Sequence, residues 1–205
     1  MPGIVAASDI SVVGPLARSA DDLAMALEAM AGPDAIDGLG WQLHLPRPRH
    51  VALRDYTVAV IYTDAEAEVD ETVQARLHVV VEFLTKSGAQ VSDTARPQID
   101  SREAHRNYLQ LLRSATSGRL SPERFQHHLQ AAAALPPDAD GYEAQSIRAQ
   151  ALYHKDWLGL NESRHRMRLA WAEFFKDYDL LLCPLEAVPM RVSPAPEDRF
   201  AMLGG

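Results

Sequence analysis

The sequence predicts an α/β protein in which a mixed or parallel sheet is combined with a large helical middle section. Three observations predict this class. Residues 57–92 alternate strand, helix and strand, residues 101–175 show mainly helical periodicity, and residues 180–184 form an apolar run that ends in proline. With 205 residues, 47% of them hydrophobic, the chain is long enough to bury the core of one domain.

The N-terminal segment, residues 1–34, contains a helix with clear start and stop signals. Ser19 is a candidate N-cap, and Asp21 and Asp22 carry negative charge to the positive end of the helix. Gly32 and Pro33 predict its end. The proline- and glycine-containing residues that follow, 33–50, predict a loop.

Residues 57–92 predict a strand–helix–strand unit. The run from Thr57 to Tyr62 is rich in β-branched residues and apolar almost throughout, which indicates a strand buried on both faces. Residues 73–84 have helical spacing, Gly88 closes the helix, and residues 89–91 start a second strand. A connection of this length favours two parallel strands joined by a crossover.

The helical section, residues 101–175, contains several predicted helices. Tyr108 and Leu111 belong to the apolar stripe of one helix, and Ser121 followed by Pro122 starts another. A long helical segment runs from about 142 to 175, and Gly159 is the expected point of a bend or a break. After the strand at 180–184, residues 186–205 predict an irregular tail.

Composition and charge exclude several classes of function. The formal net charge of −8 disfavours nucleic acid as a partner. No apolar run is long enough to cross a membrane, so we expect a soluble, cytoplasmic protein without a membrane partner. The single cysteine, Cys183, is predicted to be a small buried hydrophobic residue, and the eight histidines lack metal-site spacing. We therefore predict no metal and no cofactor.

Two stretches resemble the amidase-signature family of hydrolases. The first, residues 9–23, has Gly-Pro-Leu-Ala-Arg-Ser running directly into an acidic-capped helix. The second runs from Trp157 through Asn161 and Arg164, and then through Trp171 to the Leu-Leu-Leu-Cys-Pro run at 180–184. The strand–helix–strand unit also fits the family, although many α/β proteins share it.

The resemblance implies a portion of an α/β/α enzyme that hydrolyses carboxamide C–N bonds. In this family a serine is the nucleophile, a second serine sits on an unusual peptide bond, and a neutral lysine accepts the proton, without metal or cofactor. These groups belong to a glycine- and serine-rich core upstream of the stretch that matches residues 9–23. The implied substrate of the complete enzyme is a small-molecule amide.

No catalytic residue of the family carries over to a numbered position in this chain. The only lysines are Lys86, Lys155 and Lys176, each beside the end or middle of a predicted helix. The serine-rich run 114–118 lacks flanking glycines and suits a helix end. We therefore expect a single partial domain, inactive alone. Among the aromatic residues that could contact substrate, Tyr108 and Trp157 are the predicted substrate-binding residues, because each combines a ring with a polar tip.

Two further interpretations concern surfaces. The basic run from Arg164 to Arg168 is interpreted as the solvated face of an amphipathic helix rather than as an anion site. For the chain as a whole, the alternative to an amidase portion is a noncatalytic α/β binding or assembly module. Such a module associates with itself as a homodimer or with a complementing chain.

Overall fold

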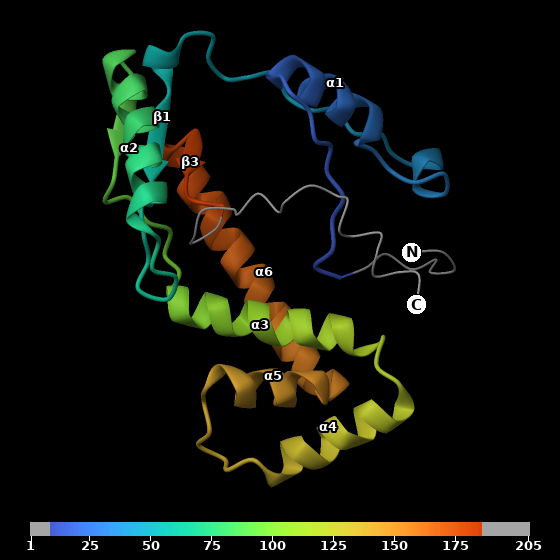
Figure 1. Cartoon of the computed structure of the whole chain (residues 1–205). Helices are drawn as coiled ribbons and strands as arrows, with labels where there is room; N and C mark the ends of the chain where they lie inside the picture. The colour runs from blue at the N-terminus through green and yellow to red at the C-terminus, as the bar shows by residue number, and fades with distance from the viewer. Residues whose placement is uncertain (1–8, 186–205) are drawn as a thin grey trace, which may run out of the picture. The chain divides into compact units, whose positions relative to one another are not determined.

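The computed structural model describes residues 9–185, so the tail predicted at 186–205 lies outside the described residues. Its contacts divide the chain into two compact units. The helical unit comprises residues 1–49 and 104–166, and the sheet unit comprises residues 50–103 and 167–205. Figure 1 labels the helices of both units and the strands β1 and β3.

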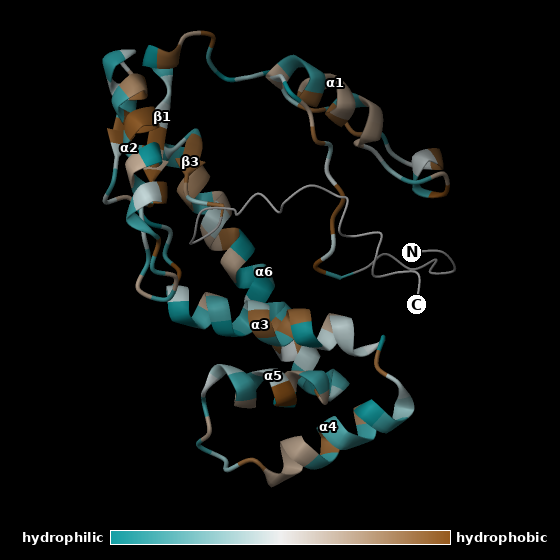
Figure 2. Cartoon of the chain, viewed as in Figure 1, coloured by the Kyte–Doolittle hydropathy of each residue, from teal (hydrophilic) through white to brown (hydrophobic). Residues whose placement is uncertain are grey.

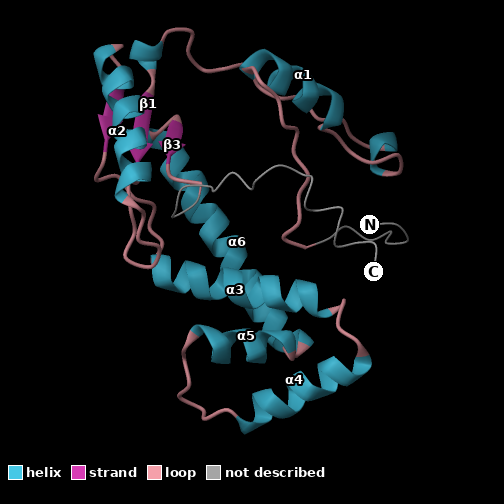
Figure 3. Cartoon of the chain, viewed as in Figure 1, coloured by secondary structure: helices cyan, strands magenta, loops and turns pink. Residues whose placement is uncertain are grey.

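The sheet unit contains three parallel strands in the order β2-β1-β3 (Figure 3). They are β1 (Thr57–Val60), β2 (Gln90–Ser92) and β3 (Leu180–Leu182). Val58 pairs with Val91 on one side and with Leu180 on the other. Three residues of β1, Val58 to Val60, are fully buried, so the expected burial of this strand on both faces is confirmed. The predicted α/β class is confirmed as well.

The connection from β1 to β2 passes through α2 (Glu71–Lys86), as the sequence predicted. The Asp70 side chain caps its start by accepting the Thr72 N–H at 2.8 Å. Gly88, just after its end, has a φ of +90°, and a Cβ at that position would lie 2.9 Å from Cβ of Arg54. Both the backbone conformation and the close approach require glycine there. A short 3₁₀ turn, Leu53–Asp55, precedes β1.

The α2 cap predicts a pH dependence of stability in the acid range. Hydrogen bonds from the Thr72 hydroxyl and then from its N–H lower the pKa of Asp70 below the ordinary 3.8. A carboxyl whose pKa is lowered in the folded state stabilises it above the unfolded pKa, and that stabilisation is lost as pH falls through the folded pKa. The free energy of unfolding, measured with urea from pH 7 to pH 2, should therefore fall more steeply with decreasing pH for the wild type than for Asp70→Asn. If the free energies of unfolding of the two proteins fell in parallel with pH, the prediction would be contradicted. Asp138→Asn is the control for removing a charge at the surface.

A group of hydrogen bonds joins the starts of β1 and β3. One Asp179 carboxylate oxygen accepts the Thr57 N–H at 2.9 Å, and the Asp179 N–H donates to the Thr57 carbonyl at 2.9 Å. His50 Nε2 lies 3.4 Å from the same carboxylate oxygen, and the Tyr56 hydroxyl donates to the His50 carbonyl at 2.9 Å. Asp179, 122 residues away from Thr57, thus fixes the relative position of the two strands.

The helical unit contains α1 (Ala20–Met30), α4 (Pro122–Ala134), α5 (Tyr142–Gln150) and most of α3 (Ser101–Ser117), with the first part of α6 (His154–Asp177) and a 3₁₀ turn, Asp37–Leu39. Both predicted caps are confirmed. Ser19 Oγ accepts the Asp22 N–H at 3.1 Å, and Ser121 Oγ accepts the Arg124 N–H at 3.3 Å.

The predicted break at Gly159 is wrong, because Gly159 lies within α6. The chain breaks instead at residues 151–153. The Ala151 N–H closes α5 on the Arg148 carbonyl, and the Tyr153 carbonyl accepts from Asp156 and Trp157 to start α6. These three residues include neither glycine nor proline, so their composition gives no sign of the break.

Two burial predictions also require correction. The buried residues of α3 are Asn107, Leu109 and Leu111, whereas Tyr108, assigned to the apolar stripe, is 52% exposed. Cys183, expected inside, is exposed, because β3 lies at an edge of the described sheet. Figure 2 shows apolar residues on β1 and β3 and a largely polar α3.

Candidate functional site

A hollow of about 190 Å³ lies in the sheet unit beyond the carboxyl ends of β1 and β3. The chain goes from β1 to β2 on one side of β1 and later adds β3 on the other side, so the strand order reverses between β1 and β3. In open parallel sheets ligands bind at such a reversal, outside the carboxyl ends of the strands. Residues with polar side chains in its lining are Thr63, Asp64 and Cys183.

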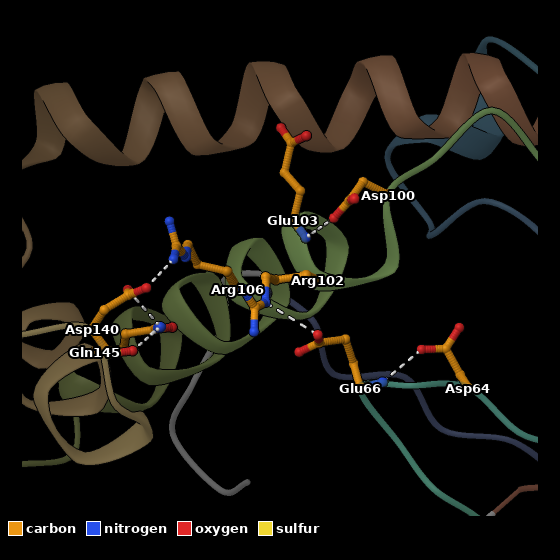
Figure 4. A network of polar contacts seen from close by, with 8 residues as sticks. All are labelled: Asp64, Glu66, Asp100, Arg102, Glu103, Arg106, Asp140 and Gln145. Carbon is orange, nitrogen blue, oxygen red and sulfur yellow. Dashed lines mark hydrogen bonds and ion pairs between the residues drawn. The ribbon is translucent and has the colours of Figure 1, made fainter.

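The loop that borders this hollow is held by its own side chains. An Asp64 carboxylate oxygen accepts the Glu66 N–H at 2.9 Å, and Thr63 Oγ1 accepts the Val69 N–H at 3.1 Å. Glu66 also pairs with Arg102 at 3.1 Å (Figure 4). These bonds orient the acidic side chains along the loop. The Cys183 thiol is the exposed polar group next to the end of β3.

A larger cavity, of about 790 Å³, lies within the helical unit. Its walls come from α3, α4, α5 and the first turns of α6. The apolar wall includes Leu129, Ala132 and Ala133 of α4, whose second half is the apolar half of that helix in Figure 2. Leu152 and Leu160 add to this wall. The polar side chains of the lining are Gln110, Arg148, Tyr153, Lys155 and Asp156.

Hydrogen bonds fix Arg148 at this cavity. Its two terminal nitrogens donate to the carbonyls of Ala139 and Pro136, each at 2.5 Å, and so tie α5 to the loop before it. The neighbouring Asp140 binds Gln145 through both its carbonyl and its carboxylate, and pairs with Arg106 (Figure 4). The loop from α4 to α5 is therefore held in place by charged side chains.

The predicted substrate-binding residues lie on the helices that form this cavity, although neither is part of its lining. Tyr108 is half exposed on α3, two positions before Gln110. Trp157 is in the first turn of α6, where its ring stacks on His154 at a centroid distance of 6.0 Å and an angle of 8°. Their assignment as substrate contacts stays a prediction.

The residues considered as catalytic candidates make local structural bonds. Thr116 Oγ1 donates to the Leu112 carbonyl at 3.0 Å, and Ser117 Oγ donates to the Ser114 carbonyl at 2.7 Å. The run 114–118 is therefore a helix end, as predicted. Two of the lysines form helical ion pairs, Lys86 with Glu82 at 3.3 Å and Lys176 with Glu173 at 2.5 Å.

The basic run on α6 differs in part from the expected solvated face. Arg166 is exposed and pairs with Glu162 at 3.2 Å, as on a solvated face. The Arg164 side chain, in contrast, is only 30% exposed, and its guanidinium contacts Asp9 and Asn161 at 2.6 Å each. Asp9 is 155 residues away from Arg164, so sequence spacing could not reveal this pair.

Residues 9–185 offer neither a metal centre nor a membrane span. No three side chains of His, Cys, Asp or Glu in this part of the chain are grouped so that they could hold a metal ion. No helix in the same range is both long and apolar enough to cross a membrane.

The chain matches one protein family and is similar to individual known proteins. The family model described as Amidase matches residues 2–200. An indoleacetamide hydrolase of Bradyrhizobium diazoefficiens is 26% identical over 194 residues, which cover 92% of this chain and 34% of that protein. One from Bradyrhizobium japonicum is 25% identical, with coverage of 92% and 38%.

A shorter match involves one component of the glutamyl-tRNA(Gln) amidotransferase of Cutibacterium acnes. It is 35% identical over 105 residues, which cover 48% of this chain and 21% of that component. The chain thus spans little more than a third of the length of the indoleacetamide hydrolases it matches.

Proposed function

Since the chain belongs to the amidase family, we propose that the complete protein hydrolyses a carboxamide C–N bond and that these 205 residues supply part of its substrate cavity. The family match, which extends over residues 2–200, carries this proposal. The catalytic serines and lysine would then come from a part of the protein outside these residues.

The described side chains support this division of roles. An amidase of this type needs a neutral lysine within hydrogen-bond reach of a serine pair, next to free backbone N–H groups. Within residues 9–185, Lys86 and Lys176 are in ion pairs, and the hydroxyls of Thr116 and Ser117 donate to helix carbonyls. The cavity lining that contains Lys155 has no serine or threonine.

The proposed substrate is a primary carboxamide on an apolar or aromatic body. The names of the two hydrolases, which act on indoleacetamide, support the aromatic body. We assign Tyr108 and Trp157 as the aromatic contacts to this body.

A fluorophosphonate probe tests whether the catalytic serine is absent from these residues. The purified 205-residue chain should not be labelled, whereas an established serine hydrolase in the same reaction should be labelled stoichiometrically. Stoichiometric labelling of the chain would overturn the assignment. A second test is to read the coding DNA upstream, where the proposal expects an in-frame glycine- and serine-rich core that contains the lysine.

The exposed surface of α1 favours a second candidate function, an assembly module. None of the residues of α1 is buried, and Met25, Leu27 and Met30 are 68%, 47% and 53% exposed. Exposed apolar faces of this kind bind a partner or aggregate. Sedimentation of the purified chain separates the two candidates. A stable dimer without labelling by the probe supports the module, and a monomer supports the amidase portion.

A further inference from the structure

We propose that the outward face of α2 is a docking surface for a second copy of this chain, with the two α2 helices packed antiparallel about a two-fold axis. The residues of this outward face are Glu71, Ala75, Arg76, Val79, Phe83 and Lys86. All of them belong to the sheet unit, so the surface is contained in one unit. The proposal depends neither on amide hydrolysis nor on the exposed surface of α1.

Helix α2 carries apolar side chains on two opposite sides. Val73, Leu77 and Leu84 share one side and are partly buried. Val79 and Phe83 lie on the other side, where they are 62% and 60% exposed. At about 100° per residue, the direction of Val79 differs from that of Leu77 by about 160°. The second apolar side is therefore left uncovered by the packing of α2 within residues 9–185.

The apolar side chains of the outward face fit a two-fold contact. Ala75, Val79 and Phe83 follow one another at intervals of four residues, so they form one stripe along the helix. If the two-fold axis passes Val79, the two Val79 side chains meet, and Phe83 of each copy lies opposite Ala75 of the other. The large ring then lies over a small methyl group, which lets the two helices approach closely.

The charges of α2 select a second copy in the antiparallel direction. Glu71 lies in the first turn of the helix and Lys86 in the last turn. An antiparallel pair places Lys86 of each copy beside Glu71 of the other, whereas a parallel pair would place Lys86 beside Lys86. Lys86 also pairs with Glu82 of its own helix at 3.3 Å, but its ammonium group has three donors and is exposed.

The two flanks of the stripe are complementary as well. In a two-fold antiparallel pair, the same flank of both helices meets. Glu71 and Lys86 lie toward one flank, and Arg76 and Phe83 lie toward the other. The Arg76 guanidinium of each copy therefore comes beside the Phe83 ring of the other, a cation–π contact. By symmetry, each ion pair and each cation–π contact occurs twice.

The size of the surface predicts a weak dimer. Helix α2 has 16 residues and is therefore about 24 Å long. A contact between two such helices buries less than about 1,200 Å², which is typical of transient association. We expect a Kd on the order of 10 to 100 µM. This association differs from the stable dimer that an assembly module would form through α1.

Sedimentation equilibrium of the purified 205-residue chain tests the proposal. We expect a monomer at about 1 µM and mainly a dimer at about 500 µM. Larger species should be absent, because a contact between identical faces closes at two copies. A monomer at every concentration, or a series of ever larger species, would overturn the proposal.

The variant Val79→Glu locates the contact on α2. It should weaken the dimer at least about 30-fold, because it places two carboxylates against each other at the axis. Glutamate is a good helix former, so the monomer should keep its circular dichroism spectrum. Leu169→Glu is the matched control, at a 71% exposed position on α6, and should leave the dimer unchanged. Equal losses in the two variants would reject the surface.

The variant Met25→Glu, on α1, separates this surface from the assembly module. It should leave the α2 dimer unchanged. If Met25→Glu abolished the dimer and Val79→Glu did not, the contact would lie on α1. That result would support the module and overturn the proposal for α2.

A charge exchange tests the antiparallel direction. Lys86→Glu and Glu71→Lys should each weaken self-association about ten-fold, because like charges replace both ion pairs. In an equimolar mixture of the two variants, every such contact of a mixed dimer again joins opposite charges. The mixture should therefore associate within about three-fold of the wild-type affinity. A mixture that associates as weakly as the single variants would reject the antiparallel arrangement.

Discussion

Replacing Leu111 with alanine should lower the free energy of unfolding of the helical unit by about 2 to 5 kcal/mol. Leu111 is 1% exposed in the middle of α3 and is one of the largest fully buried side chains among the described residues. Its loss removes apolar contact and leaves a cavity that close-packed neighbours cannot fill. Urea unfolding followed by circular dichroism at 222 nm measures the change.

The next residue of the same helix, Leu112, provides the control. It is only partly buried, so Leu112→Ala should cost less than half as much. Tyr108→Ala, at a half-exposed position, should cost less than about 1 kcal/mol. If Tyr108→Ala cost as much as Leu111→Ala, the buried face assigned to α3 would be incorrect.

Replacing Asp179 with alanine should lower the free energy of unfolding of the sheet unit by about 2 to 4 kcal/mol. The change removes the charged acceptor of the Thr57 N–H and leaves that N–H, at the start of the buried strand β1, without its side-chain partner. The Asp179 side chain is 11% exposed, so water replaces the bond only in part. His50 loses its carboxylate neighbour as well.

Two controls separate the hydrogen bond from a general effect of charge. Asp179→Asn keeps an acceptor oxygen and should cost about half as much as alanine. Asp177→Ala, at the exposed end of α6, should stay within about 0.5 kcal/mol of the wild type. Amide hydrogen exchange of β1 should accelerate in Asp179→Ala. Unchanged exchange there would contradict the role assigned to Asp179.

Local signals in the sequence predicted the elements of the fold well. Ser19 and Ser121, the predicted caps, precede their helices and cap them through their own side chains, so these boundaries depend on residues next to them. The apolar run at 57–62 predicted a buried strand because burial on both faces requires such a run. The helix boundaries and the buried strand are therefore determined by residues that are close together in the sequence.

Long-range packing decides what the sequence could not reveal. The break at 151–153 has no breaking residue, and the exposure of Cys183 depends on which strand lies at the edge of the sheet. The hollow beyond β1 and β3 exists only because residues about 120 positions apart pair. Gly159 suggested a bend or a break because glycine is a poor helix former, whereas the structure keeps it inside α6, in the wall of the cavity.

The pairing of β1 with β3 has a consequence for biosynthesis. Thr57 and Asp179 are 122 residues apart, so a ribosome that adds about 5 to 20 residues per second needs about 6 to 24 s to reach the second strand after the first. Of the described strands, only β2 is available to β1 during that interval, so the edge of β1 that later pairs with β3 lacks that partner. The nascent chain is therefore most exposed to misassociation while its helical section is being translated, which is when a chaperone would bind it.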